Sequence, residues 1–215
     1  KISFEIPNLY REGNAVIAAK DASGTILWSW HIWFTDQPQE QVYYNNVGTM
    51  MDRNLGATSA EPGDVGALGL LYQWGRKDPF RLNDPLSLTD LSLHSGHPVV
   101  SMFSDLSRAV QRPTTFATGQ DWVMDINASL WSNNMKTIYD PCPAGWRVPV
   151  REVWNGIRVK HNRDGGPYGV VLQFNEGDYF WYPDTPRIGS GSNTEHSYAS
   201  DRTELWTSDF GITRY

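Results

Sequence analysis

The chain has 215 residues, enough for one large domain, and its 40% hydrophobic and 20% charged residues are those of an ordinary globular protein. A formal net charge of -6 argues against nucleic acid as the main partner, because no Lys/Arg stripe is present to displace phosphate counterions. No apolar run approaches the roughly 20 residues that cross a bilayer. The single cysteine, Cys142, excludes an internal disulfide and a cysteine zinc cage.

Residues 1–35 are predicted to form β structure. Ile2–Ile6 alternates apolar with polar residues, and Ala15–Ala19 follows a Gly-Asn turn. A second turn, rich in polar residues and ending in glycine, precedes a third strand over Thr25–Phe34. We assign these strands to an N-terminal extension or to the end of a preceding β domain.

Both faces of the strand Thr25–Phe34 are largely apolar, which favours burial between two layers. We therefore expect Trp28 and Trp30 to be covered by another part of the protein. His31 on this strand could serve as a ligand or a catalytic base, but a partly buried histidine with satisfied hydrogen bonds is the better interpretation. A second domain is predicted over residues 36–215.

The triplet Asp52-Arg53-Asn54 follows a polar linker. Such a triplet could be catalytic. Because buried polar groups usually have structural partners, we expect carboxylates or carbonyls to hold Arg53, so that it ties loops to the core.

The next run predicts a helix over Asp64–Lys77. Apolar residues recur at helical spacing through Trp74, Asp64 can cap the first turn, and Asp78-Pro79 ends the run. The run also contains three glycines, each costing up to about 1 kcal/mol in a helix interior relative to alanine. They indicate close packing against a neighbouring element.

Residues 80–135 show turn signals and no sustained period. His94 and His97 have the i, i+3 spacing that a metal pair could use. No third histidine or well-placed carboxylate stands near them in the sequence, so we expect solvated loop histidines.

The most constrained run is Tyr139–Trp154. Prolines on both sides of Cys142 make the backbone extended there, and Gly145 allows a turn. Pro149 suits the first turn of a helix, which we predict over Val150–Ile157. Trp146 is expected to lie nearly fully buried between the two predicted helices and a sheet.

The last part of the chain alternates strands and loops. Gly169–Phe174 is predicted to be a buried strand and is followed by the aromatic segment Tyr179–Pro183. Residues 184–204 are a long polar loop, and Leu205–Ser208 begins another strand.

Three separated stretches resemble one family. Residues 51–57 (MDRNLGA), 67–79 (ALGLLYQWGRKDP) and 139–149 (YDPCPAGWRVP) together resemble the fibrobacter major paralogous domain, a module common in surface and secreted proteins of Bacteroides-type bacteria. Residues 13–34 resemble the stretch that often precedes this module. The resemblance covers roughly residues 36–209.

This resemblance implies an α+β, C-type-lectin-like fold with two helices, a small twisted antiparallel sheet and long irregular loops, preceded by the short β segment. Trp146, Arg147, Arg53 and Trp74 then have structural roles. Val150 stands where the family usually has threonine, so the helix there lacks a side-chain cap. The resemblance also implies that the chain ends before the last strands of the module.

The function implied is a non-catalytic binding or adhesion module of the cell surface or of a pilus, with a site for a glycan or a protein on the lectin-like loops. Aromatic side chains can stack on sugars or on protein side chains, and polar groups beside them orient a ligand. The candidate ligand-binding residues are Trp181, Tyr182, Asp184, Arg187, Asn193, Glu195 and Trp206.

Two alternatives stay open. The chain could be a purely structural envelope or pilus subunit without a ligand site. It could also be an oxidase similar to the formylglycine-generating enzymes of this fold, but those depend on a pair of cysteines and only Cys142 is present here. Because no combination of nucleophile, base and orienting group is recognisable, we predict no catalytic residues.

Calcium is considered because many lectins of this fold use it. Asp178, Asp184, Glu195 and Asp201 could gather around an ion if residues 175–204 fold back, but calcium needs six to eight oxygen ligands and no dense ligand spacing is present. We therefore predict no metal and no other cofactor. The expected partners are a glycan or protein ligand and neighbouring pilus or envelope subunits. The expected location is the cell surface, either anchored to the outer membrane or secreted.

Overall fold

The computed structural model of the chain describes residues 3, 5, 11–43, 48–82, 94–127, 129–161, 169–175, 178–185, 187–188, 196–197, 203–209 and 211–214. Strands dominate these residues. The strands are β1 (Gly13–Lys20), β2 (Ile26–Phe34), β3 (Glu40–Val42), β4 (Thr49–Met51), β5 (Val99–Val100), β6 (Phe116–Ala117), β7 (Arg158–His161), β8 (Gly169–Asn175), β9 (Asp178–Pro183), β10 (Arg187–Ile188), β11 (His196–Ser197), β12 (Glu204–Thr207) and β13 (Gly211–Arg214). The helical elements are the 3-10 turn η1 (Val65–Ala67), the α-helix α1 (Leu106–Val110) and the 3-10 turn η2 (Arg151–Trp154).

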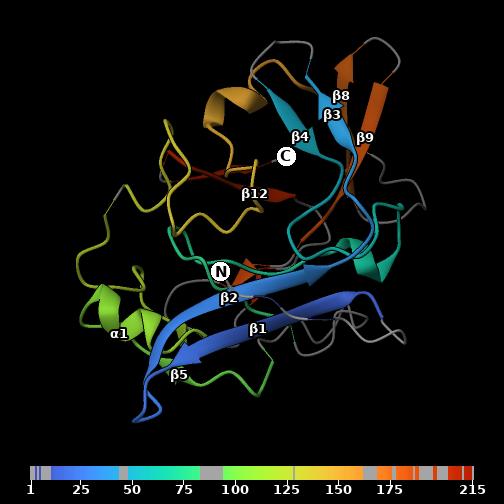
Figure 1. The fold of residues 1–215 in the computed structure, drawn as a ribbon. Helices are drawn as coiled ribbons and strands as arrows, with labels where there is room; N and C mark the ends of the chain where they lie inside the picture. The colour runs from blue at the N-terminus through green and yellow to red at the C-terminus, as the bar shows by residue number, and fades with distance from the viewer. Residues whose placement is uncertain are drawn as a thin grey trace.

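The strands form small separate sheets rather than one large one. β7, β8 and β9 make an antiparallel three-stranded sheet, and the other described strands pair two by two. All these pairs are antiparallel except β5 with β6. Figure 1 shows β3, β4, β8 and β9 at one end of the molecule and the long hairpin β1–β2 at the other, with β12 between them. Loops and side chains must therefore connect the sheets.

The predicted α+β fold with two helices is wrong. The run Asp64–Lys77 contains only η1, because Gly69 and Gly75 have φ angles of +74° and +80°. A right-handed helix cannot contain this left-handed conformation, which glycine adopts without steric cost. Asp64 does cap the short turn, since its side chain accepts a 2.8 Å hydrogen bond from the Gly66 N–H.

The second predicted helix, Val150–Ile157, is reduced to η2. Val150 makes no side-chain cap, as expected, and Asn155 is already extended with ψ of 129°. Gly156 follows at a φ of +79°, which ends the helical geometry. Within the described residues α1 has five residues, and no helix has the length and apolar character needed to span a membrane.

The hairpin β1–β2 confirms the two strands predicted from residues 15–34, paired from Gly13 opposite Phe34 to Lys20 opposite Ile26. Its inner face packs on the rest of the protein, where the Trp33 indole donates a 3.0 Å hydrogen bond to the Ala57 carbonyl oxygen.

Trp28 and Trp30 of the hairpin differ in how far they are covered. Trp28 is half-buried and its ring lies 5.7 Å from that of Tyr139. Trp30 is 36% exposed, so the prediction that both tryptophans are covered is wrong for Trp30. Strand alternation turns the Trp30 side chain away from the face that holds Ser29 and Trp33.

A buried polar group fixes the hairpin to the loop after Gly75, and we call Ser29, Lys77 and Asp78 the hairpin anchor. The Lys77 ammonium lies 2.7 Å from an Asp78 carboxylate oxygen and donates a 3.0 Å hydrogen bond to the Ser29 carbonyl oxygen. The Ser29 hydroxyl donates to the same Asp78 oxygen at 2.6 Å. The Lys77 and Asp78 side chains are 9% and 3% exposed, and burial lowers the pKa of Lys77. The charges are thus removed from water but paired.

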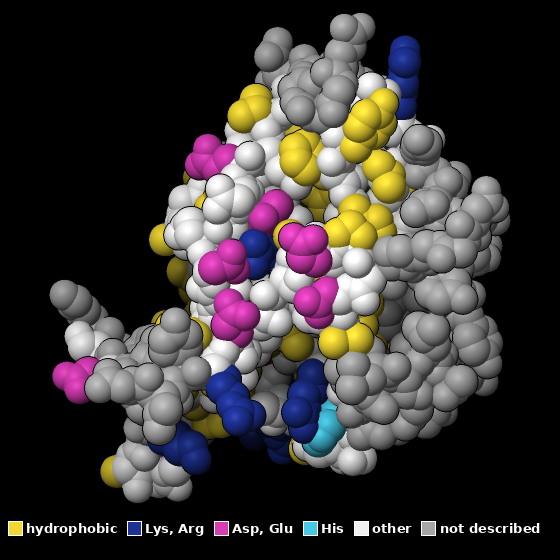
Figure 2. Space-filling model, turned by 90° about the vertical axis from the view of Figure 1, so that its right-hand side faces the viewer, with side chains coloured by type: hydrophobic (Ala, Val, Ile, Leu, Met, Phe, Trp, Pro, Cys, Tyr) yellow, Lys and Arg dark blue, Asp and Glu magenta, His cyan; other side chains and the backbone are white. Residues whose placement is uncertain are grey.

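Arg53 makes a second polar tie. Its guanidinium forms ion pairs with Asp36 and, at 2.8 Å, with Asp52, and its side chain is 5% exposed. The hydrogen bond from Arg53 lowers the pKa of Asp36. The tie joins the segment after β2 to the segment after β4. Acidic side chains gather over the middle of the face shown in Figure 2, with apolar side chains beside them.

Among the described residues, the buried hydrophobic side chains fall into four clusters rather than one. The clusters consist of Tyr43, Val153, Trp154, Val170, Leu172 and Tyr182; of Phe103, Ala109, Ala117, Trp122, Val123 and Leu130; of Trp74, Trp131 and Val148; and of Phe80 and Phe116. Each small sheet has only a small apolar face, so each cluster contains few side chains. The space between the clusters forms the candidate site.

Candidate ligand-binding site

A cavity of about 760 Å³ lies between the four clusters, and we call it the aromatic pocket. Ligand pockets in proteins usually have volumes of about 300–1,000 Å³ and mostly apolar walls. Its aromatic lining comprises Tyr72, Trp74, Phe116, Trp122, Trp131, Trp146, Trp154, Tyr182 and Trp206. Its aliphatic lining comprises Met50, Met51, Leu55, Leu68, Leu70, Leu71, Leu82, Ala117, Ile126, Val148, Val150, Val153, Ile188 and Leu205.

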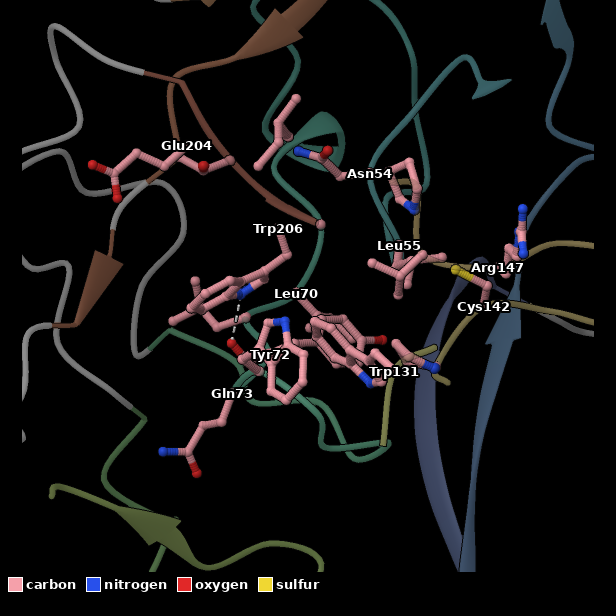
Figure 3. A pocket seen from close by; sticks show the side chains of 18 of the residues that line it. Asn54, Leu55, Leu70, Tyr72, Gln73, Trp131, Cys142, Arg147, Glu204 and Trp206 are labelled. Carbon is pink, nitrogen blue, oxygen red and sulfur yellow. Dashed lines mark hydrogen bonds between the residues drawn. The ribbon is translucent and has the colours of Figure 1, made fainter. Parts of the chain in front are cut away.

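One wall of the pocket depends on a glycine. The Leu70 N–H donates a 2.9 Å hydrogen bond to the Leu55 carbonyl oxygen, which brings two segments together. A Cβ at Gly69 would lie 2.7 Å from that same oxygen, so only glycine fits this approach. Figure 3 shows the Leu55 and Leu70 side chains around the aromatic residues of the pocket.

Two reciprocal indole hydrogen bonds fix β12 against residues 72–74. The Trp206 indole donates to the Tyr72 carbonyl oxygen at 2.9 Å (Figure 3). The Trp74 indole donates in the other direction, to the Thr207 carbonyl oxygen at 2.8 Å. Trp206 nevertheless stays 37% exposed. Its ring is therefore held in place while part of its surface faces open space.

The rings of the pocket form a continuous chain. Trp74 and Trp131 have ring centroids 5.6 Å apart, and Trp131 meets Trp206 edge to face at 6.3 Å. These separations lie in the range that favours aromatic pairs. The Trp131 indole donates a 3.0 Å hydrogen bond to the Tyr139 carbonyl oxygen, which anchors the middle ring of the chain.

A buried carboxylate shapes the opposite wall, the elbow over residues 139–149. One Asp140 oxygen accepts hydrogen bonds from the Cys142 N–H and the Lys136 ammonium, both at 2.9 Å. The other oxygen accepts from the Val148 N–H at 2.9 Å. The two prolines keep the backbone around Cys142 extended, and the hydrogen bonds of Asp140 hold the two ends of the elbow together. Cys142 and Val148 are thereby placed on the pocket.

Burial favours the neutral forms of Cys142, Tyr72 and His31, which lie in or beside the pocket. Burial, with Asp140 nearby, raises the pKa of the Cys142 thiol, and burial also raises the pKa of the Tyr72 hydroxyl. Burial lowers the pKa of His31 to about 4. The Tyr72 hydroxyl donates to His31 Nδ1 at 3.2 Å, and His31 Nε2 donates to the Asn14 side-chain oxygen at 2.8 Å. The expectation of a satisfied, partly buried His31 is confirmed.

Trp146 corrects another expectation. It is half-buried and lines the pocket, rather than being nearly fully buried between two helices and a sheet. Without those helices the indole is only partly covered. The neighbouring Arg147 is exposed and donates a 2.6 Å hydrogen bond to the Asn133 carbonyl oxygen.

Of the ligand-binding residues suggested from the sequence, Tyr182 and Trp206 line the pocket. Tyr182 is 2% exposed, and its hydroxyl is placed 3.2 Å from both the Gln41 side-chain oxygen and the Met51 carbonyl oxygen. Its role in the described structure is therefore to join β9 to β3 and β4. Trp206 is the residue of the two whose ring a ligand can reach.

The other suggested residues lie elsewhere. Asp184 accepts a 3.0 Å hydrogen bond from the Thr203 hydroxyl, and neither it nor Trp181 is among the described residues of the pocket lining. Arg187 belongs to β10, but its side chain is outside the described part of the structure. Asn193 and Glu195 also fall outside the described residues.

Several pocket residues were not suggested by the sequence as ligand-binding. Leu70, Tyr72, Cys142 and Trp146 lie inside the motifs that carry the family resemblance. Trp131 lies in the run without a sustained period. The only indication of these residues in the sequence was the high density of aromatic residues, which does not show which rings lie together.

His94 and His97 are hydrogen-bonded rather than solvated. His94 Nδ1 accepts a 3.0 Å hydrogen bond from the Gly96 N–H, and its Nε2 meets the Arg81 guanidinium. His97 Nε2 accepts from the Arg81 N–H at 3.3 Å, and His97 Nδ1 donates to the Thr114 carbonyl oxygen at 2.9 Å. These bonds hold the loop together and occupy the nitrogens that a metal ion needs.

No group of three or more histidine, cysteine, aspartate or glutamate residues suited to a metal ion occurs among the described residues. The proposed calcium ligands are mostly outside that part of the chain. Glu195, Asp201 and the side chain of Asp178 are not described, so the calcium question stays a prediction.

No protein-family model matches the chain, and comparisons with curated proteins and with solved structures give no significant match. The resemblance of residues 51–57, 67–79 and 139–149 to one module therefore stays a prediction. Function has to be argued from the pocket.

Proposed function

We propose that this chain is a non-catalytic binding module whose ligand occupies the aromatic pocket. The observation that carries the proposal is the cavity of about 760 Å³ with aromatic walls. Protein interiors are packed closely, with few voids larger than a water molecule, and apolar surface left without contacts loses stability. A space of this size between four clusters is explained if a ligand completes the packing.

The walls are arranged in advance of binding. The Trp206 indole is held by its hydrogen bond to Tyr72, and Trp131 by its bond to Tyr139. Side chains that are already ordered lose little conformational entropy when a ligand arrives, which favours affinity. The pocket is therefore better suited to recognition than a loop of mobile polar groups.

The neutral state of nearby groups supports a non-catalytic role. The raised pKa of Cys142 disfavours the thiolate that a cysteine nucleophile needs. His31 uses both ring nitrogens in hydrogen bonds to Asn14 and Tyr72, so neither is free to take a proton from a substrate.

The location at a cell surface or in a pilus, with envelope or pilus subunits as neighbours, is a further part of the proposal. Its support is the resemblance of residues 51–57, 67–79 and 139–149 to a module of such proteins. Labelling of intact cells with a membrane-impermeant reagent tests it. Labelling only after lysis contradicts it.

Thermal unfolding with a panel of oligosaccharides, short peptides and neutral aromatic compounds tests the binding function. A ligand that binds the folded state raises the midpoint by mass action. We expect at least one compound to raise it for the wild type and for Trp30→Ala, but not for Trp206→Ala. The two tryptophans have nearly equal exposure, 36% and 37%, and only Trp206 lines the pocket. A panel without any Trp206-dependent shift contradicts the proposal.

A further inference from the structure

We propose that the ligand of the aromatic pocket is an uncharged, largely apolar molecule carrying a flat ring, and not a glycan. This inference rests on the proposed binding function and adds the chemical class of the ligand. Four features of the pocket carry it: the use of its indole donors, the use of its other polar groups, its charge balance, and the arrangement of its rings.

The indole donors of four pocket tryptophans already bond to carbonyl oxygens of the protein. Trp206 donates to Tyr72 at 2.9 Å and Trp74 to Thr207 at 2.8 Å. Trp122 donates to Trp74 at 2.6 Å and Trp131 to Tyr139 at 3.0 Å. Each indole has one donor and no acceptor. These side chains therefore offer a ligand ring surface and no hydrogen bond.

The amide of Gln73, which also lines the pocket, is engaged in the same way. Its nitrogen donates to the Ala117 carbonyl oxygen at 2.7 Å, and its oxygen accepts from the Ala117 N–H at 3.4 Å. The Arg76 guanidinium, 2% exposed, donates to that oxygen at 3.0 Å. The amide thus continues the strand pairing of β6 and is held there by a buried cation. The Tyr72 hydroxyl is likewise used, by His31.

These engaged groups argue against a sugar. A glycan carries many hydroxyl groups, and each one that loses water without gaining a protein partner weakens binding. A site built for hydroxyl groups presents unpaired amides, carboxylates or carbonyls beside its rings. Here the polar groups named above point into the protein instead.

The charged residues of the lining balance one another. They are two cations, Arg53 and Arg147, and two anions, Asp121 and Glu204. Arg53 is paired with carboxylates outside the lining. Figure 3 shows the Glu204 and Arg147 side chains at opposite edges of the view, both away from the rings. The lining therefore carries no excess of either charge to attract a charged ligand, and burying one there is unfavourable.

The rings themselves indicate a flat partner. The series Trp74, Trp131 and Trp206 continues through centroid separations of 5.6 and 6.3 Å and ends in a ring that is 37% exposed. A ligand ring placed against Trp206 extends this series by one member. Aromatic pairs gain energy beyond simple burial when rings stack with an offset or meet edge to face.

The test uses three probes of matched design. N-phenyl-1-naphthylamine is neutral and aromatic, 1-anilinonaphthalene-8-sulfonate has the same rings with one negative charge, and maltohexaose is a neutral glycan. The two dyes are titrated by fluorescence and the sugar by calorimetry. We expect saturable binding of the neutral dye, binding of the sulfonate weaker by about tenfold or more, and no heat from the sugar.

Variants locate the binding. Trp206→Ala is expected to weaken the neutral dye by about tenfold or more, whereas Trp30→Ala leaves it within about twofold. Trp206→Phe keeps a ring but lacks the indole N–H, so it should bind within about fivefold of the wild type. Cooperative unfolding of each variant shows that it folds. If Trp206→Ala does not fold, the comparison of the three probes on the wild type still decides the ligand class.

The outcomes separate the two proposals. Trp206-dependent binding of maltohexaose without binding of the neutral dye overturns the ligand class and leaves the binding function intact. Equal affinity for the two dyes overturns the requirement for an uncharged ligand. Failure of all three probes, together with failure of the wider panel, overturns the binding function itself.

Discussion

The hairpin anchor and the aromatic pocket are both interior regions, but they are built in opposite ways. The anchor places an ammonium, a carboxylate and a hydroxyl within hydrogen-bonding distance, and Lys77 also lies 4.6 Å from the centre of the Trp28 ring. In the pocket, the indoles of Trp74, Trp122, Trp131 and Trp206 have their donors bonded to the protein, and the rings surround a cavity of about 760 Å³. One region is polar and filled, and the other is apolar and open.

This difference separates stabilisation from recognition. Charges taken out of water must be paired, so removing one member of the anchor leaves its partner buried without a counter-charge. An apolar cavity costs stability only through the contacts that its walls do not make, and a bound ligand can supply those contacts. The hairpin anchor, the elbow and Arg53 make the polar ties between segments, and the pocket offers a ligand mainly apolar contacts.

The largest effect is expected from breaking the anchor. Asp78→Ala leaves the buried Lys77 ammonium without its counter-charge, and such losses cost about 3–5 kcal/mol of unfolding free energy. Asp36→Ala is the matched control, because the Asp36 carboxylate is 63% exposed and Arg53 keeps its second partner, Asp52. It should cost less than about 1 kcal/mol. Urea unfolding measures both, and equal losses contradict the contrast.

The elbow should be nearly as sensitive. Asp140→Ala removes the acceptor of two backbone N–H groups and of Lys136, which we expect to cost about 2–4 kcal/mol. Asp105→Ala is the control, because the exposed Asp105 carboxylate caps the short helix α1 through the Arg108 N–H and otherwise accepts from the neighbouring Ser104 hydroxyl. A clearly smaller loss is expected there. If urea unfolding gives Asp140→Ala the smaller loss, the elbow is not organised by its carboxylate.

The hydrogen bonds of His31 predict a pH dependence. The pKa of His31 in the fold, about 4, lies below its ordinary value of 6.5, so the neutral form is the one that the fold stabilises. This contribution is present above pH 6.5 and is lost as the pH falls towards 4, by about 3 kcal/mol.

His31→Gln should remove this dependence, because glutamine can accept from Tyr72 and donate to Asn14 without titrating. The measurement is the difference in unfolding free energy between wild type and variant at several pH values. A difference that stays constant between neutral pH and pH 4 contradicts the assignment.

A smaller effect tests the wall of the pocket. Gly69→Ala forces a left-handed residue and places a methyl group 2.7 Å from the Leu55 carbonyl oxygen. A loss of about 2 kcal/mol is expected. Gly24→Ala, with a φ of +86° but nothing within 4 Å, should lose about 1 kcal/mol. Only the Gly69 variant should also weaken binding of the neutral dye. Equal effects of both on unfolding and binding would show that the close approach is unimportant.

The sequence predicted the elements that depend on neighbouring residues. The strands of the β1–β2 hairpin follow from alternating side chains and a glycine turn, and Asp64 was identified as a cap. The two helices failed because apolar spacing alone does not reveal that Gly69 and Gly75 take left-handed angles. The cost of three glycines in a helix interior was a better indication of the structure than the apolar spacing, because it argued against a helix.

The pocket could not be predicted because it is assembled from distant segments. The pocket lining combines Leu55, Tyr72, Trp131, Cys142 and Trp206, which are far apart in the sequence. Trp206 was suggested from the strand that contains it, but the hydrogen bond that fixes its ring depends on a carbonyl group 134 residues away. Composition showed many tryptophans and not which of them share a cavity.

The central claim is that a neutral aromatic molecule enters the space between the four clusters. The most direct measurement uses Cys142, the single cysteine of the chain, which lines that space. The rate of its alkylation by iodoacetamide, which is slow because burial raises the pKa of the thiol, is followed over hours at mildly alkaline pH and over a range of N-phenyl-1-naphthylamine concentrations. The account predicts that the rate falls in proportion to dye occupancy, with its midpoint at the dissociation constant found by fluorescence. An unchanged rate at saturating dye would contradict it.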